Sequence, residues 1–79
     1  MTRIEGITVD PKVMLGKPVI EGTRVTVESV LERLGSGDSV EEIADSHPRL
    51  TSEKVRAAVR YAALVLNMDE VYPSASRPS

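Results

Sequence analysis

Apolar residues recur at helical spacing through the middle of the chain. The spacing i, i+3, i+4, i+7, which places side chains on one face of an amphipathic helix, is met by Val27, Val30, Leu31 and Leu34. Thr26 stands directly before this run and is a favourable N-cap residue, whereas the Gly-Ser-Gly run at 35–37 favours a helix end. The pattern therefore predicts a first helix that begins after Thr26 and stops at the glycine run.

A second and a third helical pattern follow, separated by a short turn. Ser39 and Glu42 match a capping box, which marks a helix start. The run His-Pro-Arg-Leu at 47–50 interrupts this helix, because proline cannot continue it, and Thr51 caps the next one. The third helix extends to residue 70, and its predicted core stripe consists of Val55, Ala58, Val59, Ala62, Ala63 and Leu66.

The first 25 residues favour short extended segments over helix. Ile7–Val9 is β-branched and alternates, which predicts a strand that ends at the Asp-Pro pair 10–11. Residues 17–20 predict a second strand, and Arg24–Val25 predicts a third extended piece. Since strands this short are marginal alone, we expect them to pair across a partner chain or to pack on the helices.

These segments divide the chain into three regions. Residues 1–25 form an N-terminal β element, residues 26–70 a three-helix domain, and residues 71–79 a Pro- and Ser-rich tail that we expect to be mobile and free to order on a partner. The expected fold class is therefore mostly α. A short helix, a tight turn and a longer helix form the arrangement of a DNA-binding helix-turn-helix, although a simple αα corner in a small bundle has the same pattern.

Size and composition narrow the class of protein. The 79 residues carry a net charge of −2, no cysteine and a single histidine, so we expect neither disulfides nor a metal site to stabilise the domain. A domain this small buries only about 60% of its unfolded surface, which favours oligomerisation as the remaining source of stability. The longest apolar run is shorter than a membrane span and the N-terminus lacks the apolar segment of a signal peptide, so we expect a cytoplasmic protein without a membrane partner.

Charge is unevenly distributed along the helices. Residues 28–45 carry six acids against one base, whereas residues 46–60 carry four bases against one acid. A recognition helix needs basic character at its N-terminal end, where side chains reach base edges and phosphates. An ordinary solvated helix face has the same composition. On the first interpretation, the residues that contact DNA are Thr51, Ser52, Lys54, Arg56 and Arg60.

The second half of the third helix is apolar nearly all round, from Tyr61 to Met68. The other two helices of so small a domain cannot cover every side of it, so one side is left for a subunit contact, unless the helix is central and buried. Together with the short strands, this pattern predicts a homodimer. The expected interface consists of Ile7, Val9, Tyr61, Leu64, Val65 and Met68.

The remaining polar motifs give little support to catalysis. Gly16 and Lys17 lack the spacing of a phosphate loop, and the glycines in this region are better explained by tight turns. Arg24 either pairs with a carboxylate such as Asp10 or faces DNA. His47 stands alone in a turn without a nucleophile, and the acids show no metal-ligand spacing. We therefore expect no enzyme activity, no cofactor and no metal site.

Four runs of the sequence together resemble one protein family. They are Ile-Thr-Val-Asp-Pro at 7–11, Gly-Lys-Pro-Val-Ile-Glu-Gly-Thr-Arg-Val at 16–25, His-Pro-Arg-Leu-Thr at 47–51 and Ala-Ala-Val-Arg-Tyr-Ala at 57–62. The second run is the most specific. The family comprises small prokaryotic proteins catalogued as a domain of unknown function, family 433, and grouped with VapB-type antitoxins. The resemblance spans residues 4–64.

The resemblance implies a homeodomain-like three-helix helix-turn-helix fold with a small N-terminal β element, and a homodimer. It also implies that the protein neutralises a neighbouring toxin with a PIN-like nuclease fold and represses its own gene by binding double-stranded operator DNA. The DNA-contact role is carried over only to the five residues that the charge pattern selects. The main alternative is a protein-interaction module of the same fold that does not bind DNA, which the low overall charge favours.

Overall fold

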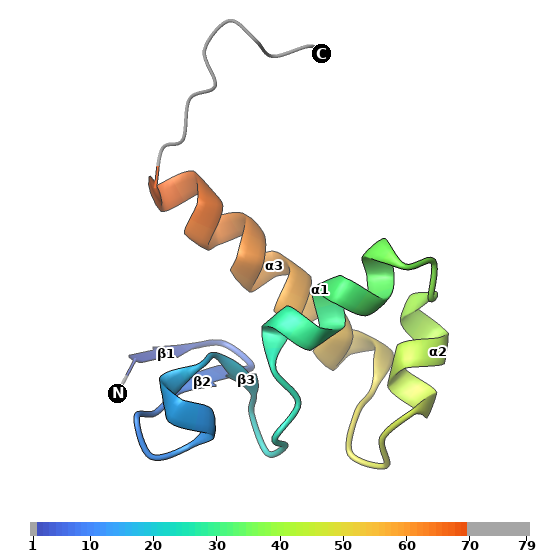
Figure 1. Cartoon of the computed structure of the whole chain (residues 1–79), viewed down its shortest axis with the longest axis horizontal. Helices are drawn as coiled ribbons and strands as arrows, with labels where there is room; N and C mark the ends of the chain where they lie inside the picture. The colour runs from blue at the N-terminus through green and yellow to red at the C-terminus, as the bar shows by residue number, and fades with distance from the viewer. Residues whose placement is uncertain (1, 70–79) are drawn as a thin grey trace, which may run out of the picture.

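A computed structural model of the chain describes the backbone of residues 2–69 and the side chains of residues 5–67, so the predicted tail 71–79 and the side chain of Met68 lie outside the described parts. Three helices pack with a small antiparallel sheet (Figure 1), which confirms the predicted mostly α architecture with an N-terminal β element. The elements in chain order are β1 (Thr2–Ile4), β2 (Ile7–Val9), a 3-10 turn η1 (Met14–Gly16), β3 (Val19–Ile20), α1 (Val27–Gly35), α2 (Val40–Asp45) and α3 (Ser52–Asp69).

The sheet has the strand order β1-β2-β3, and both neighbouring pairs are antiparallel. Ile4 pairs with Ile7 across a two-residue turn, and Ile7 pairs in turn with Ile20. The sequence pattern does not predict β1, because its three residues are stabilised as a strand by pairing with β2. The strands pair within one chain and pack on α3, which is the second of the two expected alternatives.

The predicted third extended piece at Arg24–Val25 is not a strand of its own, but it leads into an isolated antiparallel bridge between Thr26 and Val19 beside β3. A turn closed by a hydrogen bond from the Thr23 N–H to the Ile20 carbonyl oxygen (3.0 Å) reverses the chain first. Gly22 takes the left-handed φ of +83° that the third position of a type II turn requires. The Val25 carbonyl oxygen still accepts from the Ile20 N–H (2.9 Å), but the chain must then enter α1 and leaves the sheet.

The hairpin between β1 and β2 lies directly on α3. Gly6 has a left-handed φ of +84°, and a Cβ placed on it would lie 3.1 Å from the Cβ of Ala57. We expect Gly6→Ala to lower the free energy of unfolding by about 1–2 kcal/mol, because an L residue is strained in this conformation. Urea denaturation followed by circular dichroism measures the change.

Gly35, the last residue of α1, is the matched control for Gly6. It has ordinary helical backbone, and a Cβ added to it would enter open space, so Gly35→Ala should raise the free energy of unfolding by about 0.4–1 kcal/mol. Effects of the same sign and size for the two variants would contradict the explanation from the left-handed turn.

All three predicted helix starts are confirmed by side-chain caps. In each, a hydroxyl oxygen accepts a hydrogen bond from the backbone N–H three residues on: Thr26 from Ser29 (3.0 Å), Ser39 from Glu42 (3.0 Å) and Thr51 from Lys54 (3.1 Å). The capping box at the start of α2 is complete, because the Glu42 carboxylate accepts from the Ser39 N–H (2.7 Å). These caps satisfy backbone donors that the first helical turn leaves unpaired.

The predicted glycine stop after α1 is also confirmed. Gly37 has a φ of +106°, and its N–H donates to the Leu34 carbonyl oxygen (3.1 Å). The Asp38 N–H donates to the Arg33 carbonyl oxygen (3.0 Å). This pair of bonds is a Schellman motif, which needs a residue that adopts the left-handed conformation cheaply.

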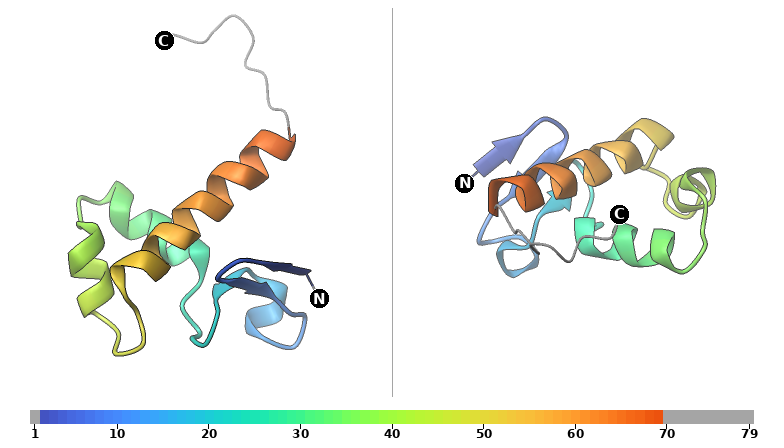
Figure 2. Two further views of the ribbon diagram at one scale, coloured as in Figure 1. Left: turned by 180° about the vertical axis from the view of Figure 1, so that it is seen from behind. Right: turned by 90° about the horizontal axis from the view of Figure 1, so that it is seen from above.

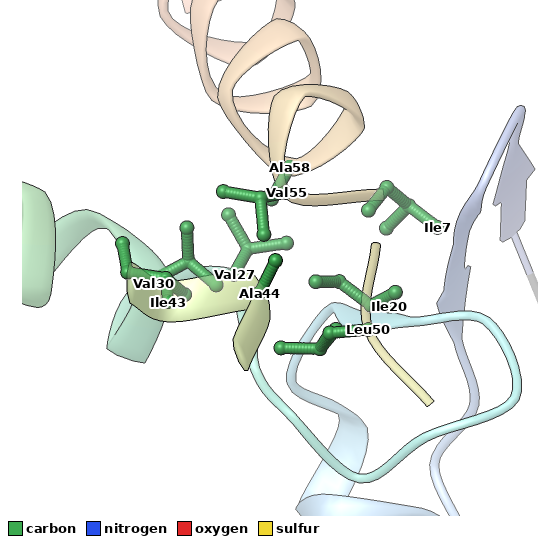
Figure 3. Close-up of a cluster of buried hydrophobic side chains, with 9 residues drawn as sticks. All are labelled: Ile7, Ile20, Val27, Val30, Ile43, Ala44, Leu50, Val55 and Ala58. Carbon is green, nitrogen blue, oxygen red and sulfur yellow. The ribbon is translucent and has the colours of Figure 1, made fainter. Parts of the chain in front are cut away.

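One hydrophobic core joins the sheet to all three helices (Figure 3). It consists of Ile7, Ile20, Val27, Val30, Ile43, Ala44, Leu50, Val55 and Ala58. The side chain of Ile7 is fully buried within the single chain. It therefore belongs to this core, which corrects its predicted place in a dimer interface. Val9, on the same strand, is half-buried.

The second half of α3 projects beyond the core, on the side away from α2 (Figure 1; Figure 2). The predicted core stripe of this helix is therefore corrected: Val55 and Ala58 are buried, but Ala63 is exposed and Leu66 is 63% exposed. The short helices α1 and α2 and the small sheet cover α3 mainly over its first half, and beyond it Tyr61 and Ala62 are only partly buried against the core. Within the described part of the chain, α3 included, no helix combines the length and apolar character needed to cross a bilayer.

Candidate nucleic-acid interface

The predicted tight turn joins α2 to α3. Ser46 is the C-cap of α2 and Thr51 is the N-cap of α3, so four residues, 47–50, lie between the two caps. A hydrogen bond from the Leu50 N–H to the His47 carbonyl oxygen (3.1 Å) closes the turn, and the buried Leu50 side chain anchors it in the core. The arrangement is compatible with a helix-turn-helix in which the start of α3 is exposed.

The residues predicted to contact DNA lie at the N-cap and in the first turns of α3: Thr51, Ser52, Lys54, Arg56 and Arg60. The Thr51 hydroxyl is engaged as the helix cap, and the Lys54 Nζ donates to the Arg49 carbonyl oxygen (3.3 Å). Arg56 is exposed and makes no hydrogen bond or ion pair with the described residues. We call Lys54, Arg56 and Arg60 the basic edge of α3.

Arg60 is held in an exposed ion pair with Glu53. Its Nη2 lies 2.6 Å from Glu53 Oε2, and both side chains are more than half exposed. The hydrogen bond from Arg60, followed by the charge of Arg60, lowers the pKa of the Glu53 carboxyl, against a small opposing effect of desolvation. Because exposed ion pairs contribute little net stability, a phosphate can replace Glu53 as the partner of Arg60 at small cost.

Arg60→Ala is expected to raise the pKa of Glu53 back toward its ordinary value, because both main causes of the lowering are lost. A lowered pKa in the folded state stabilises the fold above the pKa of the unfolded chain, and this contribution is lost as the pH falls through the folded pKa. An NMR titration of the Glu53 carboxyl carbon measures the change. Arg56→Ala is the control, since the charge of Arg56 is the smallest of the causes; equal shifts in the two variants would contradict the assignment.

A second basic feature adjoins the start of α3, and the sequence pattern alone does not predict it. Arg24, His47 and Arg49 line one open groove of about 480 Å³, although Arg24 lies more than twenty residues before the other two. The rest of the lining consists of Thr8, Val13, Val19, Gly22 and Thr23. The Asp10 carboxylate, considered above as a partner of Arg24, accepts from the backbone N–H of Lys12 (2.9 Å). The runs that contain Arg24 and His47–Arg49 are visible in the sequence, but only the tertiary fold brings them together.

The basic edge and the groove both carry cations and hydrogen-bond donors, and the bond from Lys54 Nζ to the Arg49 carbonyl oxygen joins the two. Such groups bind the oxygens of anions, and of phosphates in particular. In the part of the chain whose side chains are described, no three His, Asp or Glu residues gather where they can share a metal ion. The cationic side chains of this surface are suited to bind an anion.

A protein-family model matches the part of the chain that forms this surface. The family model described as protein of unknown function (DUF433) matches residues 7–62, well over half of the chain. The chain belongs to the DUF433 family. In this DUF433 chain, the matched segment runs from β2 into α3 and includes the groove and the basic edge, but stops before the projecting part of α3. No solved structure matches the chain.

A curated relative from Sinorhizobium fredii (strain NBRC 101917 / NGR234), named uncharacterized protein y4eO, is 41% identical over 58 residues. The alignment covers 73% of this chain and 26% of the relative. The chain therefore spans about a quarter of the length of the curated relative it matches, and a segment of this kind also occurs within a longer protein.

Proposed function

We propose that the chain is the antitoxin of a type II toxin–antitoxin pair: a cytoplasmic homodimer that binds its own operator DNA and neutralises a PIN-like nuclease toxin. The observation that carries the DNA-binding part is the basic edge, in which Arg56 and Arg60 are exposed on the longer helix of a helix-turn-helix arrangement. The antitoxin part rests on the family resemblance of the sequence runs described above.

Local charge supports DNA binding despite the acidic composition of the chain. The net charge of −2 gives no general attraction to a polyanion, so affinity depends on the basic surface itself. Arg56 and Arg60 are four residues apart on α3 and share one face. The first turn of α3 adds backbone N–H groups, which favour a phosphate. On this proposal the acidic side chains of α1 and α2 face away from the duplex.

A partner surface is supported by a different part of the molecule. An apolar groove of about 500 Å³ runs between α1 and α3, with Glu28 and Glu32 at its rim. Its apolar lining consists of Pro18, Val27, Leu31, Tyr61, Ala62, Val65 and Leu66. Exposed apolar surface of this kind is typical of protein contacts, and it favours the second candidate function, a protein-interaction module that does not bind DNA.

The proposed dimer uses the projecting half of α3, where Leu64 is 43% exposed. Leu64→Glu is expected to shift the protein toward monomer, because a carboxylate in an apolar contact loses its hydration without gaining a partner. Sedimentation velocity at micromolar concentration measures the oligomeric state. Leu64→Met keeps the apolar surface and should remain dimeric, whereas a parent protein that sediments as a stable monomer would contradict the dimer itself.

Co-expression with the product of the neighbouring gene tests the two candidate functions together. The antitoxin proposal expects the two proteins to purify as a complex, the nuclease activity of the partner to be suppressed, and the complex to retard DNA from upstream of the gene in a gel shift. A complex that forms but leaves this DNA unretarded would favour the protein-interaction module. Retarded DNA without any partner complex would favour a repressor with no antitoxin role.

A further inference from the structure

We infer that Arg24, His47 and Arg49 form a phosphate-binding groove that holds the DNA backbone beside the basic edge of α3. The inference rests on the proposed function, because its ligand is a phosphodiester of the duplex that α3 contacts. It gives a role to two sequence runs that the basic edge leaves unexplained, Gly-Thr-Arg at 22–24 and His-Pro-Arg at 47–49.

Arg24 emerges from a backbone that is fixed on both sides. The Thr23 hydroxyl donates to the Ile20 carbonyl oxygen (2.8 Å) and accepts from the Val25 N–H (2.9 Å). The Thr23 N–H donates to the same Ile20 oxygen (3.0 Å). Three hydrogen bonds around one threonine therefore hold the turn that directly precedes Arg24, while the arginine side chain itself is exposed. Such pre-organisation lowers the entropy cost of binding a ligand at this point.

His47 lines the same groove and carries a hydrogen-bond donor. Its Nδ1 accepts from the backbone N–H of Arg49 (3.2 Å), so in the neutral ring the proton resides on Nε2. His47 and Arg24 also line a second groove, between the start of α1 and the end of α2. Both side chains therefore lie where the two grooves meet. The Arg49 carbonyl oxygen accepts from Lys54 Nζ (3.3 Å), which connects the groove to the first turn of α3.

The charges of the groove favour an anion. Its lining contains two arginines and no carboxylate. Three other bases, Lys17, Arg33 and Arg60, are paired with acids at 3.2 Å or less. No ion pair in the described part of the chain reaches Arg24 or Arg49. Two unpaired guanidinium groups beside an N–H donor match the oxygens of a phosphate, and contacts to the phosphates beside the reading helix fix the position of a protein on a duplex.

Arg24→Gln and Arg49→Gln, made singly and together in the full chain, test this inference. Fluorescence anisotropy measures their affinity for labelled duplex from upstream of the gene at 50 to 200 mM salt. Each lost phosphate contact should lower the slope of log affinity against log salt by about one unit. The affinity of the parent should therefore fall roughly tenfold further than that of the double variant over this range.

Lys17→Gln is the matched control for the single variants. It also removes one exposed positive charge, but Lys17 is paired with Glu28 and does not line the groove, so the slope should stay unchanged. Circular dichroism confirms that each variant is folded. If the parent binds the duplex and the double variant shows the same salt slope, the groove is not a phosphate site. The proposed function would still stand in that case. A parent that binds no duplex overturns both.

A titration with inorganic phosphate distinguishes two ligands for the groove, a free phosphate ion and the DNA backbone. In an NMR titration of the full chain, the duplex should shift the amide signals of residues 22–24, His47 and Arg49. The opposite result is that these signals shift with millimolar inorganic phosphate but not with a duplex that binds elsewhere on the protein. That result would contradict the DNA backbone as the ligand of the groove.

Discussion

Ile43→Ala is expected to lower the free energy of unfolding by about 3 kcal/mol, the largest stability change among the single substitutions considered. The Ile43 side chain is 1% exposed and belongs to the core where α2 meets α1 and α3. Its truncation leaves a cavity where the three helices meet. Since a domain of this size has little stability in reserve, the variant should be largely unfolded near physiological temperature.

Leu66→Ala is the control for this prediction. It also truncates an apolar side chain, but Leu66 is 63% exposed on the projecting half of α3, so the change should stay within about 0.5 kcal/mol. Urea denaturation at fixed protein concentration compares the two, because the proposed dimer would make stability depend on concentration. Similar losses for both variants would contradict the described core.

Removal of the basic edge should have the largest effect on DNA binding. Arg56→Ala with Arg60→Ala is expected to lower the salt slope by about two units if both side chains contact phosphates. If one of them contacts a base edge, the variant should instead lose about 1–3 kcal/mol on the operator and discriminate less against unrelated sequence. Titrations of operator and shuffled duplex at several salt concentrations distinguish the two outcomes.

Lys12→Ala with Lys17→Ala removes the same number of positive charges from a loop outside α3 and is the matched control. It should change the affinity for DNA much less than the Arg56 and Arg60 pair does. Should the variant of α3 bind like the parent while it remains folded and dimeric, the basic edge is not the DNA-binding surface. The protein-interaction module would then be the better account of the chain.

Local signals explain which parts of the fold the sequence predicts. Helix starts depend on single polar side chains and on residues three positions away, so Thr26, Ser39 and Thr51 mark them without knowledge of the tertiary structure. β1 has no such signal, because its strand conformation depends on pairing with β2. The apolar spacing of α3 continues past the core, and spacing alone does not reveal that Leu66 stays largely exposed.

The sequence likewise predicts one part of the candidate site and not the other. The basic edge follows from helical periodicity, since Arg56 and Arg60 are one turn apart wherever the helix lies. The groove does not follow from any local rule, because Arg24 meets His47 and Arg49 only when the turn after β3 packs against the turn after α2. The ion pair between Glu53 and Arg60 joins residues seven apart on one face of α3, and sequence leaves open whether it forms.

Competition between operator and shuffled DNA tests the central claim most directly. Labelled duplex from upstream of the gene is titrated with the full-length protein near physiological salt, and unlabelled operator or a shuffled duplex of the same length and composition is added as competitor. The account predicts that the operator competes at least about 10³-fold better than the shuffled duplex, as specific DNA-binding proteins do. Equal competition by the two duplexes, or no binding of the labelled duplex, would contradict it.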